Sequence, residues 1–199
     1  MKRALRRLAR LRGCGELEQK PLGAPRNRLP FRGVLAQLDR PSDRAPSGAR
    51  GHRVILTRGA AEAVLPTLIG MAVSYKAGWD GHDVQRKVGV ITWAEIQRGE
   101  VLVEGFLYEK DFPNLADALA ELDGRLGMSY EIDEAHVVDM RSQIWILDRV
   151  RSFSGAAILL KSHAAYAGTS FGLALGALAR PLAIAAATDA LQLQGVACD

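Results

Sequence analysis

The four histidines and a few serines are the side chains of this sequence that could carry nucleophilic catalysis, and His82 and Ser129 are the candidates among them. Ser129 lies near the start of a predicted strand, and its hydroxyl becomes a good nucleophile only when a neighbouring base removes its proton. His82 follows a turn that ends at Gly81, and Asp83 beside it can help to stabilise an imidazolium. An imidazole within hydrogen-bond reach could supply that base. On residue type alone, Ser129 and His82 are an ordinary strand serine and a surface histidine.

The short motifs of most other chemistries are missing. No phosphate-binding loop, dinucleotide fingerprint or zinc-ligand spacing is present in the sequence. Cys14 and Cys198 stand near opposite ends of the chain, outside any metal spacing, and they do not suggest a disulfide framework. We therefore expect no metal, no cofactor and a reducing compartment.

The elements that must position the two residues are mostly strands. Strand patterns occur at residues 31–38, 52–57, 70–75, 88–93, 101–108, 127–138, 143–150 and 153–160, with Arg98-Gly99-Glu100 as a hairpin connection. Helices are predicted at 60–68 and 111–125, the second capped by Asp111 with Pro113 in its first turn. About seven strands with short links indicate an α+β domain, built on an antiparallel barrel or sheet with helices packed outside it.

The two ends of the chain differ in composition from this body. Residues 1–28 form a basic arm, because six cations and no acid lie among residues 1–12, whereas the whole chain has a net charge of +4. The remainder of the chain is therefore slightly acidic. Residues 171–199 form an Ala/Leu-rich tail, with a helix expected at 188–194.

The overall composition is that of an ordinary soluble globular protein, with 48% apolar and 24% charged residues. The basic N-terminus lacks the apolar run of a secretory signal. The longest apolar stretch, residues 171–187, is interrupted by Arg180 and Pro181 and is short for a bilayer. These features predict a soluble, intracellular protein that has no membrane partner.

Several short motifs follow one another along residues 31–170. They are Gly33-Val34-Leu35-Ala36, the loop 39–43, Gly59-Ala60, His82-Asp83 with Val88-Gly89, Val103-Glu104-Gly105-Phe106-Leu107, Gly127-Met128-Ser129-Tyr130, Ser154-Gly155-Ala156-Ala157-Ile158-Leu159 and Ala164-Ala165-Tyr166. In this order they resemble the prohead (procapsid) maturation serine proteases of tailed bacteriophages. That family is distantly similar to the assemblin proteases of herpesviruses. Each motif is short, and it is their common order that carries the resemblance.

The resemblance implies both a fold and a chemistry. The fold would be a herpesvirus-protease-like antiparallel β-barrel flanked by helices, over residues 29–170. Ser129 would attack a peptide carbonyl of the phage scaffold or major capsid protein, with His82 as its base. The protein would act as an oligomer inside the assembling procapsid, in the cytoplasm of the bacterial host. Self-cleavage that removes the basic arm would fit the same role.

The third catalytic residue stays open at this point. Proteases of this family and their herpesvirus relatives use an acid or a second histidine on a strand near the serine. A hairpin closed by the turn at 139–142 would put Ser129 opposite Ser152. Four residues on that face could then orient His82. They are Glu131, Asp133, Asp148 and Ser154.

The other three histidines are not expected to take part in catalysis. His136 has an odd spacing from Ser129 and should face the opposite side of the strand. His52 and His163 match no family motif, and we interpret them as surface residues.

Two other functions fit parts of the sequence. One is a catalytically inert capsid-assembly or scaffold protein that retains the protease fold, because the third residue is unassigned. The other is a nucleic-acid-binding protein that uses the basic arm. No aromatic residue interleaves the cations of that arm, so nucleic acid is not expected as a partner. A serine endopeptidase is the interpretation we prefer.

Overall fold

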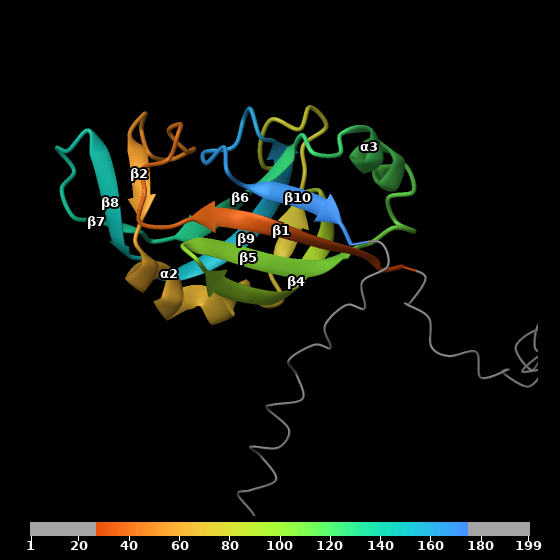
Figure 1. Ribbon diagram of the computed structural model, residues 1–199, viewed down its shortest axis with the longest axis horizontal. Coiled ribbons are helices and arrows are strands. Elements are labelled where there is room, and N and C mark those ends of the chain that lie inside the picture. The colour runs from red at the N-terminus through yellow and green to blue at the C-terminus, as the bar shows by residue number, and fades with distance from the viewer. Residues whose placement is uncertain (1–26, 175–199) are drawn as a thin grey trace, which may run out of the picture.

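The computed structural model describes residues 27–174, which form two β-sheets and few helices (Figure 1). The large sheet has the strand order β10-β1-β5-β4-β3-β9-β6, and the small sheet has the order β2-β8-β7. The large sheet comprises β1 Leu29–Gln37, β3 Ala72–Ser74, β4 Lys87–Gln97, β5 Glu100–Leu107, β6 Leu126–Asp133, β9 Ser152–Leu160 and β10 Ser170–Leu173. The small sheet comprises β2 Arg53–Leu56, β7 His136–Val137 and β8 Ile144–Arg149. The helices are α2 Arg58–Val64, the 3-10 helix η1 Leu65–Leu68 and α3 Leu115–Glu121.

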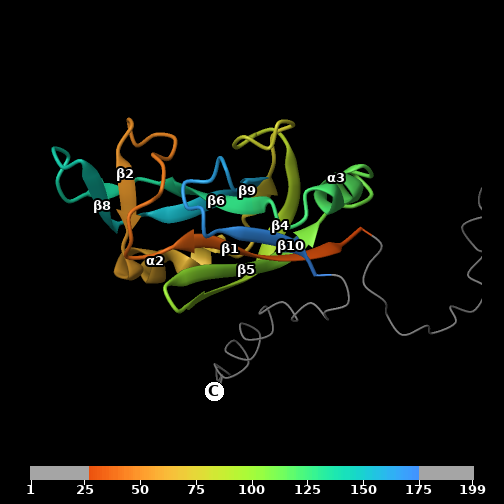
Figure 2. The ribbon, with the colours of Figure 1, turned by 45° about the horizontal axis from the view of Figure 1, so that its top comes forward.

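The large sheet curls into a half-barrel. Its last strand, β6, lies against β1 and β10, which are at the other end of the strand order. The backbone N–H of Met128 in β6 donates to the hydroxyl of Thr169, just before β10, at 3.3 Å. Figure 2 shows β6 and β9 on one side of this curl and β1 and β5 on the other. The largest interior side chains are at most 1% exposed and include Phe31, Ile91, Leu107, Phe153 and Ile158.

Strand β5 and its turn illustrate why the sequence forms these strands. Val101, Val103, Gly105 and Leu107 are buried, and the residues that alternate with them are partly exposed, as expected for a strand with one face on the core. Arg98 has φ 51° and Gly99 has φ 84°, the two left-handed conformations that a tight hairpin turn requires. The predicted hairpin is confirmed, and Glu100 is the first residue of β5.

The mostly β architecture with few helices agrees with the predicted α+β class, but the expectation of a purely antiparallel sheet is wrong. Strand β3 pairs in parallel with β9, and β2 pairs in parallel with β8. The separate small sheet was also not expected. Figure 1 shows the small sheet at one end of the molecule and α3 at the opposite end.

The predicted strand 127–138 is in fact two strands that belong to different sheets. It breaks after Asp133, where Glu134 adopts a left-handed φ of 48°. β6 pairs with β9, so that Ser129 lies opposite Ala157, and Ser152 pairs with Asp133. The turn at 139–142 joins β7 to β8 and not β6 to β8. The expected pairing of Ser129 with Ser152 is therefore wrong.

Residues 60–68 are helical as predicted, and only the second predicted helix is shorter than expected. The first becomes α2 followed by η1, because Pro66 has no N–H to continue the α-helical pattern. The second begins at Leu115 and not at Asp111, whose carboxylate accepts a hydrogen bond from the Asn27 amide at 3.1 Å. The N-cap of α3 is Asn114, so Asp111 does not cap the helix.

The predictions for the two ends of the chain fall largely outside the described residues. Strand β10 spans the predicted boundary between the domain, which was expected to end at residue 170, and the Ala/Leu-rich tail. Most of the basic arm and the helix predicted at 188–194 lie outside the described residues. Within residues 27–174, no helix is both long enough and apolar enough to cross a membrane.

Candidate active site

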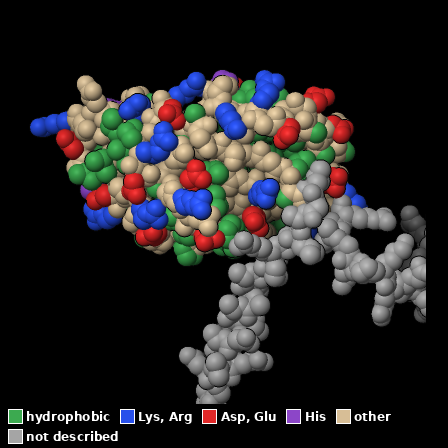
Figure 3. All heavy atoms as spheres, viewed as in Figure 1, with side chains coloured by type: hydrophobic (Ala, Val, Ile, Leu, Met, Phe, Trp, Pro, Cys, Tyr) green, Lys and Arg blue, Asp and Glu red, His purple; other side chains and the backbone are tan. Residues whose placement is uncertain are grey.

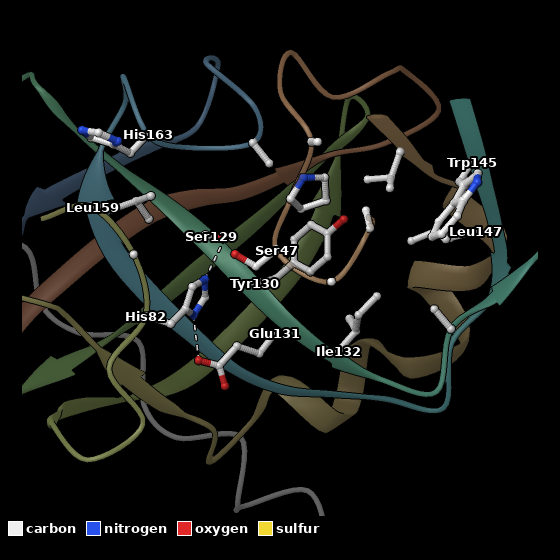
Figure 4. A pocket seen from close by; sticks show the side chains of 18 of the residues that line it. Ser47, His82, Ser129, Tyr130, Glu131, Ile132, Trp145, Leu147, Leu159 and His163 are labelled. Atoms are coloured by element: carbon white, nitrogen blue, oxygen red, sulfur yellow. Dashed lines mark hydrogen bonds and ion pairs between the residues drawn. The ribbon is translucent and has the colours of Figure 1, made fainter. Parts of the chain in front are cut away.

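Ser129, His82 and Glu131 form one hydrogen-bonded series (Figure 4). The Nε2 atom of His82 lies 3.0 Å from the Ser129 Oγ. The Nδ1 atom of the same ring lies 2.7 Å from Oε1 of Glu131. Both distances fall in the range needed for proton transfer and for orientation of a general base. The series has the geometry of a Ser-His-acid triad.

Strand β6 places the nucleophile and the acid on the same face. Ser129 and Glu131 are two residues apart, and side chains at that spacing point to the same side of a strand. His82 reaches both of them from the loop 75–86, which joins β3 to β4. The side chains of His82 and Glu131 are each 24% exposed, so the pair is partly shielded from water and remains open to a substrate.

The contacts of His82 determine which of its ring nitrogens carries the proton. A carboxylate only accepts hydrogen bonds, so the Glu131 contact places the proton of neutral His82 on Nδ1. The Nε2 atom is then the acceptor for the Ser129 hydroxyl, which is the arrangement in which imidazole acts as the base. Asp83 does not share this role, because its carboxylate accepts from the backbone N–H of Gln85.

Gly155 in β9 provides the space that the Glu131 carboxylate occupies. It is directly opposite Glu131 in the sheet. A Cβ atom at this position would lie 2.8 Å from Oε2 and 3.2 Å from Cδ of Glu131. This role of Gly155 depends on the pairing of β6 with β9, which the sequence does not specify.

Replacing Gly155 by alanine is expected to push the Glu131 carboxylate away from His82 and to lower kcat/KM by about tenfold or more. The fold should persist, since alanine suits a strand at least as well as glycine does. Peptide hydrolysis and the denaturation midpoint would be measured for this variant and for Gly172→Ala, where an added Cβ meets nothing within 4 Å. Equal kcat/KM in the two variants would show that Gly155 does not matter to the site.

Of the four acid and hydroxyl candidates, Glu131 alone contacts His82. The carboxylate of Asp133 lies 3.5 Å from the Ser152 hydroxyl. Ser154 makes no hydrogen bond to His82, and Asp148 belongs to the small sheet, where it pairs with His136.

The other three histidines lie apart from the triad. His136 forms an exposed pair with Asp148 at 2.5 Å, and this hydrogen bond lowers the pKa of the Asp148 carboxyl. His52 stacks on Trp145, with ring centroids 4.5 Å apart. His163 is an exposed residue on the rim of the site, as expected for a surface side chain.

The triad lies in a cleft of about 730 Å³ between β6, the loop 45–49 and the small sheet. On the Ser129 side, the lining mixes polar side chains, such as His163, with apolar ones, such as Leu159 (Figure 4). On the other side it is apolar and includes Ile132, Trp145 and Leu147. This volume is in the range of clefts that enclose a sizeable ligand.

Two tyrosines beside the cleft are protected from ionisation. The hydroxyl of Tyr130 is buried next to Tyr166 and makes no hydrogen bond of good geometry in the described part of the chain. Burial raises the pKa of Tyr130 well above its ordinary value, and it also raises the pKa of Tyr166. The folded protein therefore favours neutral tyrosines, and this stability is present below about pH 10 and is lost as the pH rises further.

Replacing Tyr130 by phenylalanine is expected to stabilise the fold by about 1 kcal/mol at pH 7, because it removes an unpaired buried hydroxyl. The variant should also lose less stability above pH 10. Urea unfolding between pH 7 and 11 would measure both effects, with Tyr108→Phe as the control. An unchanged pH dependence in Tyr130→Phe would contradict this assignment.

No protein-family model matches this chain, and a search of curated proteins found no match. Within residues 27–174, no group of three or more His, Cys, Asp or Glu side chains is arranged to hold a metal ion.

Proposed function

We propose that this chain is a serine endopeptidase of the prohead-maturation type, which cleaves scaffold or major capsid protein during capsid assembly. The observation that carries the proposal is the hydrogen-bonded series Ser129–His82–Glu131 in a cleft of about 730 Å³. The curled seven-stranded sheet with peripheral helices is compatible with a herpesvirus-protease-like fold. The resemblance in the order of the motifs supplies the substrate class.

In this reaction Ser129 Oγ forms a bond to the substrate carbonyl carbon while its proton passes to Nε2 of His82. Glu131 holds the opposite ring nitrogen and stabilises the imidazolium. The proton on Nε2 then goes to the leaving amine as the C–N bond breaks, and an acyl-enzyme remains. Water, deprotonated by His82, hydrolyses that ester and restores Ser129.

The surface of the body does not favour nucleic acid as the substrate. On the face seen in Figure 3, Lys and Arg side chains are interspersed with Asp and Glu side chains and form no continuous basic area. Binding to phosphate backbones needs such an area.

Co-expression with the major capsid or scaffold protein encoded beside this chain tests the proposal. Intact-mass spectrometry would compare the wild type with Ser129→Ala and with Ser154→Ala, a second serine that does not contact His82. We expect defined fragments with the wild type and Ser154→Ala and none with Ser129→Ala. An uncut partner in all three, with the protein folded, would favour the inert assembly protein instead.

A further inference from the structure

We propose that Trp79 is a positioning residue that fixes the imidazole of His82 between Ser129 and Glu131. This inference rests on the proposed serine-protease function. It concerns how the loop 75–86, which carries the general base, is held against the sheet that carries the nucleophile.

The backbone of Trp79 has an unusual conformation. Its φ is 55°, in the left-handed region that a non-glycine residue rarely adopts. Its N–H donates to the Lys76 carbonyl at 2.8 Å, and its carbonyl accepts from the N–H of Leu160 at 2.8 Å. Leu160 ends β9, the strand that pairs with β6. The strained residue therefore ties the loop to the neighbour of the strand that bears Ser129.

The ring of Trp79 also packs within the loop 75–86. It stacks on Tyr75 with a centroid separation of 4.7 Å and an interplanar angle of 25°. The guanidinium of Arg86 lies 5.2 Å from the centroid of the same Tyr75 ring. The first and last residues of the loop, together with Trp79 in its middle, thus form one stacked cluster.

Trp79 makes the last backbone–backbone hydrogen bonds before His82, and the carboxylate of the next residue, Asp80, forms an exposed ion pair with Lys76 at 3.2 Å. Within the described residues, no hydrogen bond to another backbone group holds residues 80–82. The ring of His82 is instead held at its own contacts of 3.0 Å to Ser129 and 2.7 Å to Glu131. A displacement of about 1 Å in such a site can cost on the order of 100-fold in rate. Loss of the anchor would therefore act on catalysis through the position of His82.

The test compares Trp79→Leu, which removes the aromatic stack, with Trp79→Phe, which keeps an aromatic ring. Gln85→Ala, an exposed residue of the same loop, is the matched control. Long-range ¹H–¹⁵N spectra report the tautomer of His82, with His82→Ala to assign the signals. The labelling rate of Ser129 by a fluorophosphonate, and kcat and KM on a cleaved peptide, report the working site.

For Trp79→Leu we expect a 10- to 100-fold fall in labelling rate and in kcat with KM within about twofold, because the substrate contacts remain. His82 should change from the Nδ1–H tautomer to a mixture of tautomers, and Trp79→Phe should restore most of both signals. Arg86→Gln, at a partly exposed position, provides a milder version of the test if Trp79→Leu fails to fold, with an expected loss of about threefold or more.

A wild-type tautomer and a labelling rate within about twofold of wild type in Trp79→Leu would overturn the positioning role. A fixed His82 tautomer in a wild-type protein that cleaves no partner would instead overturn the protease function and leave the positioning of His82 standing.

Discussion

Replacing His82 by alanine is expected to lower kcat/KM by about 10⁴- to 10⁶-fold and to leave the protein folded. His82 is the only base within reach of the Ser129 hydroxyl among the described residues, at 3.0 Å, and without it the serine keeps its proton. The side chain is partly exposed and belongs to a loop, so its loss should change the denaturation midpoint little.

The matched control is His136→Ala, which removes a histidine that also pairs with a carboxylate but lies on the small sheet. Steady-state hydrolysis of a cleaved peptide and circular dichroism would be measured for both variants. Activity of His82→Ala within tenfold of the wild type would exclude His82 as the general base. A comparable loss in His136→Ala would point to a general effect of the substitutions on the fold.

Replacing Glu131 by glutamine is expected to lower kcat/KM by about 10²- to 10⁴-fold with little change in KM. The amide has nearly the same size as the carboxylate but carries no charge, so it cannot stabilise the imidazolium that forms during the reaction. Its NH₂ group can also donate to Nδ1, which would place the ring proton on Nε2 and block acceptance from Ser129.

Asp133→Asn is the control for this substitution, because Asp133 follows Glu131 by two residues on the same strand and its carboxylate contacts the Ser152 hydroxyl instead of His82. We expect this variant to stay within about twofold of the wild type. The comparison needs kcat and KM for both variants at the same pH. An unchanged kcat in Glu131→Gln, or an equal loss in Asp133→Asn, would remove Glu131 from its assigned role.

The candidate site was only partly predictable from the sequence. His82 and Ser129 could be selected because of their residue types and because the order of the flanking motifs resembles a known family. The acid could be narrowed to a small set by the period of two along the strand, which puts Glu131 and Asp133 on the face of Ser129. Glu131 could not be selected from that set, because the choice depends on the position of a loop that comes from another part of the chain.

The incorrectly predicted pairing of Ser129 with Ser152 also shows that sequence patterns do not specify which strands are neighbours. Period-two patterns identify strands but do not name their neighbours, and the polar turn at 139–142 suggested a hairpin that would join Ser129 to Ser152. Glu134 adopts a left-handed conformation that ends β6, and the chain continues into β7 of the small sheet. Gly155 had no visible role until the pairing of β6 with β9 put it opposite Glu131.

The sequence by itself determined the class of the fold, most of its strands and the tight turn at Arg98 and Gly99. These depend on local preferences, such as alternation, turn conformations and side-chain chemistry, which act over a few residues. Only the tertiary structure decided which acid orients His82, where the cleft lies and how the loop of the base is anchored at Trp79. Those features depend on contacts between segments far apart in the chain, such as the 47 positions that separate His82 from Ser129.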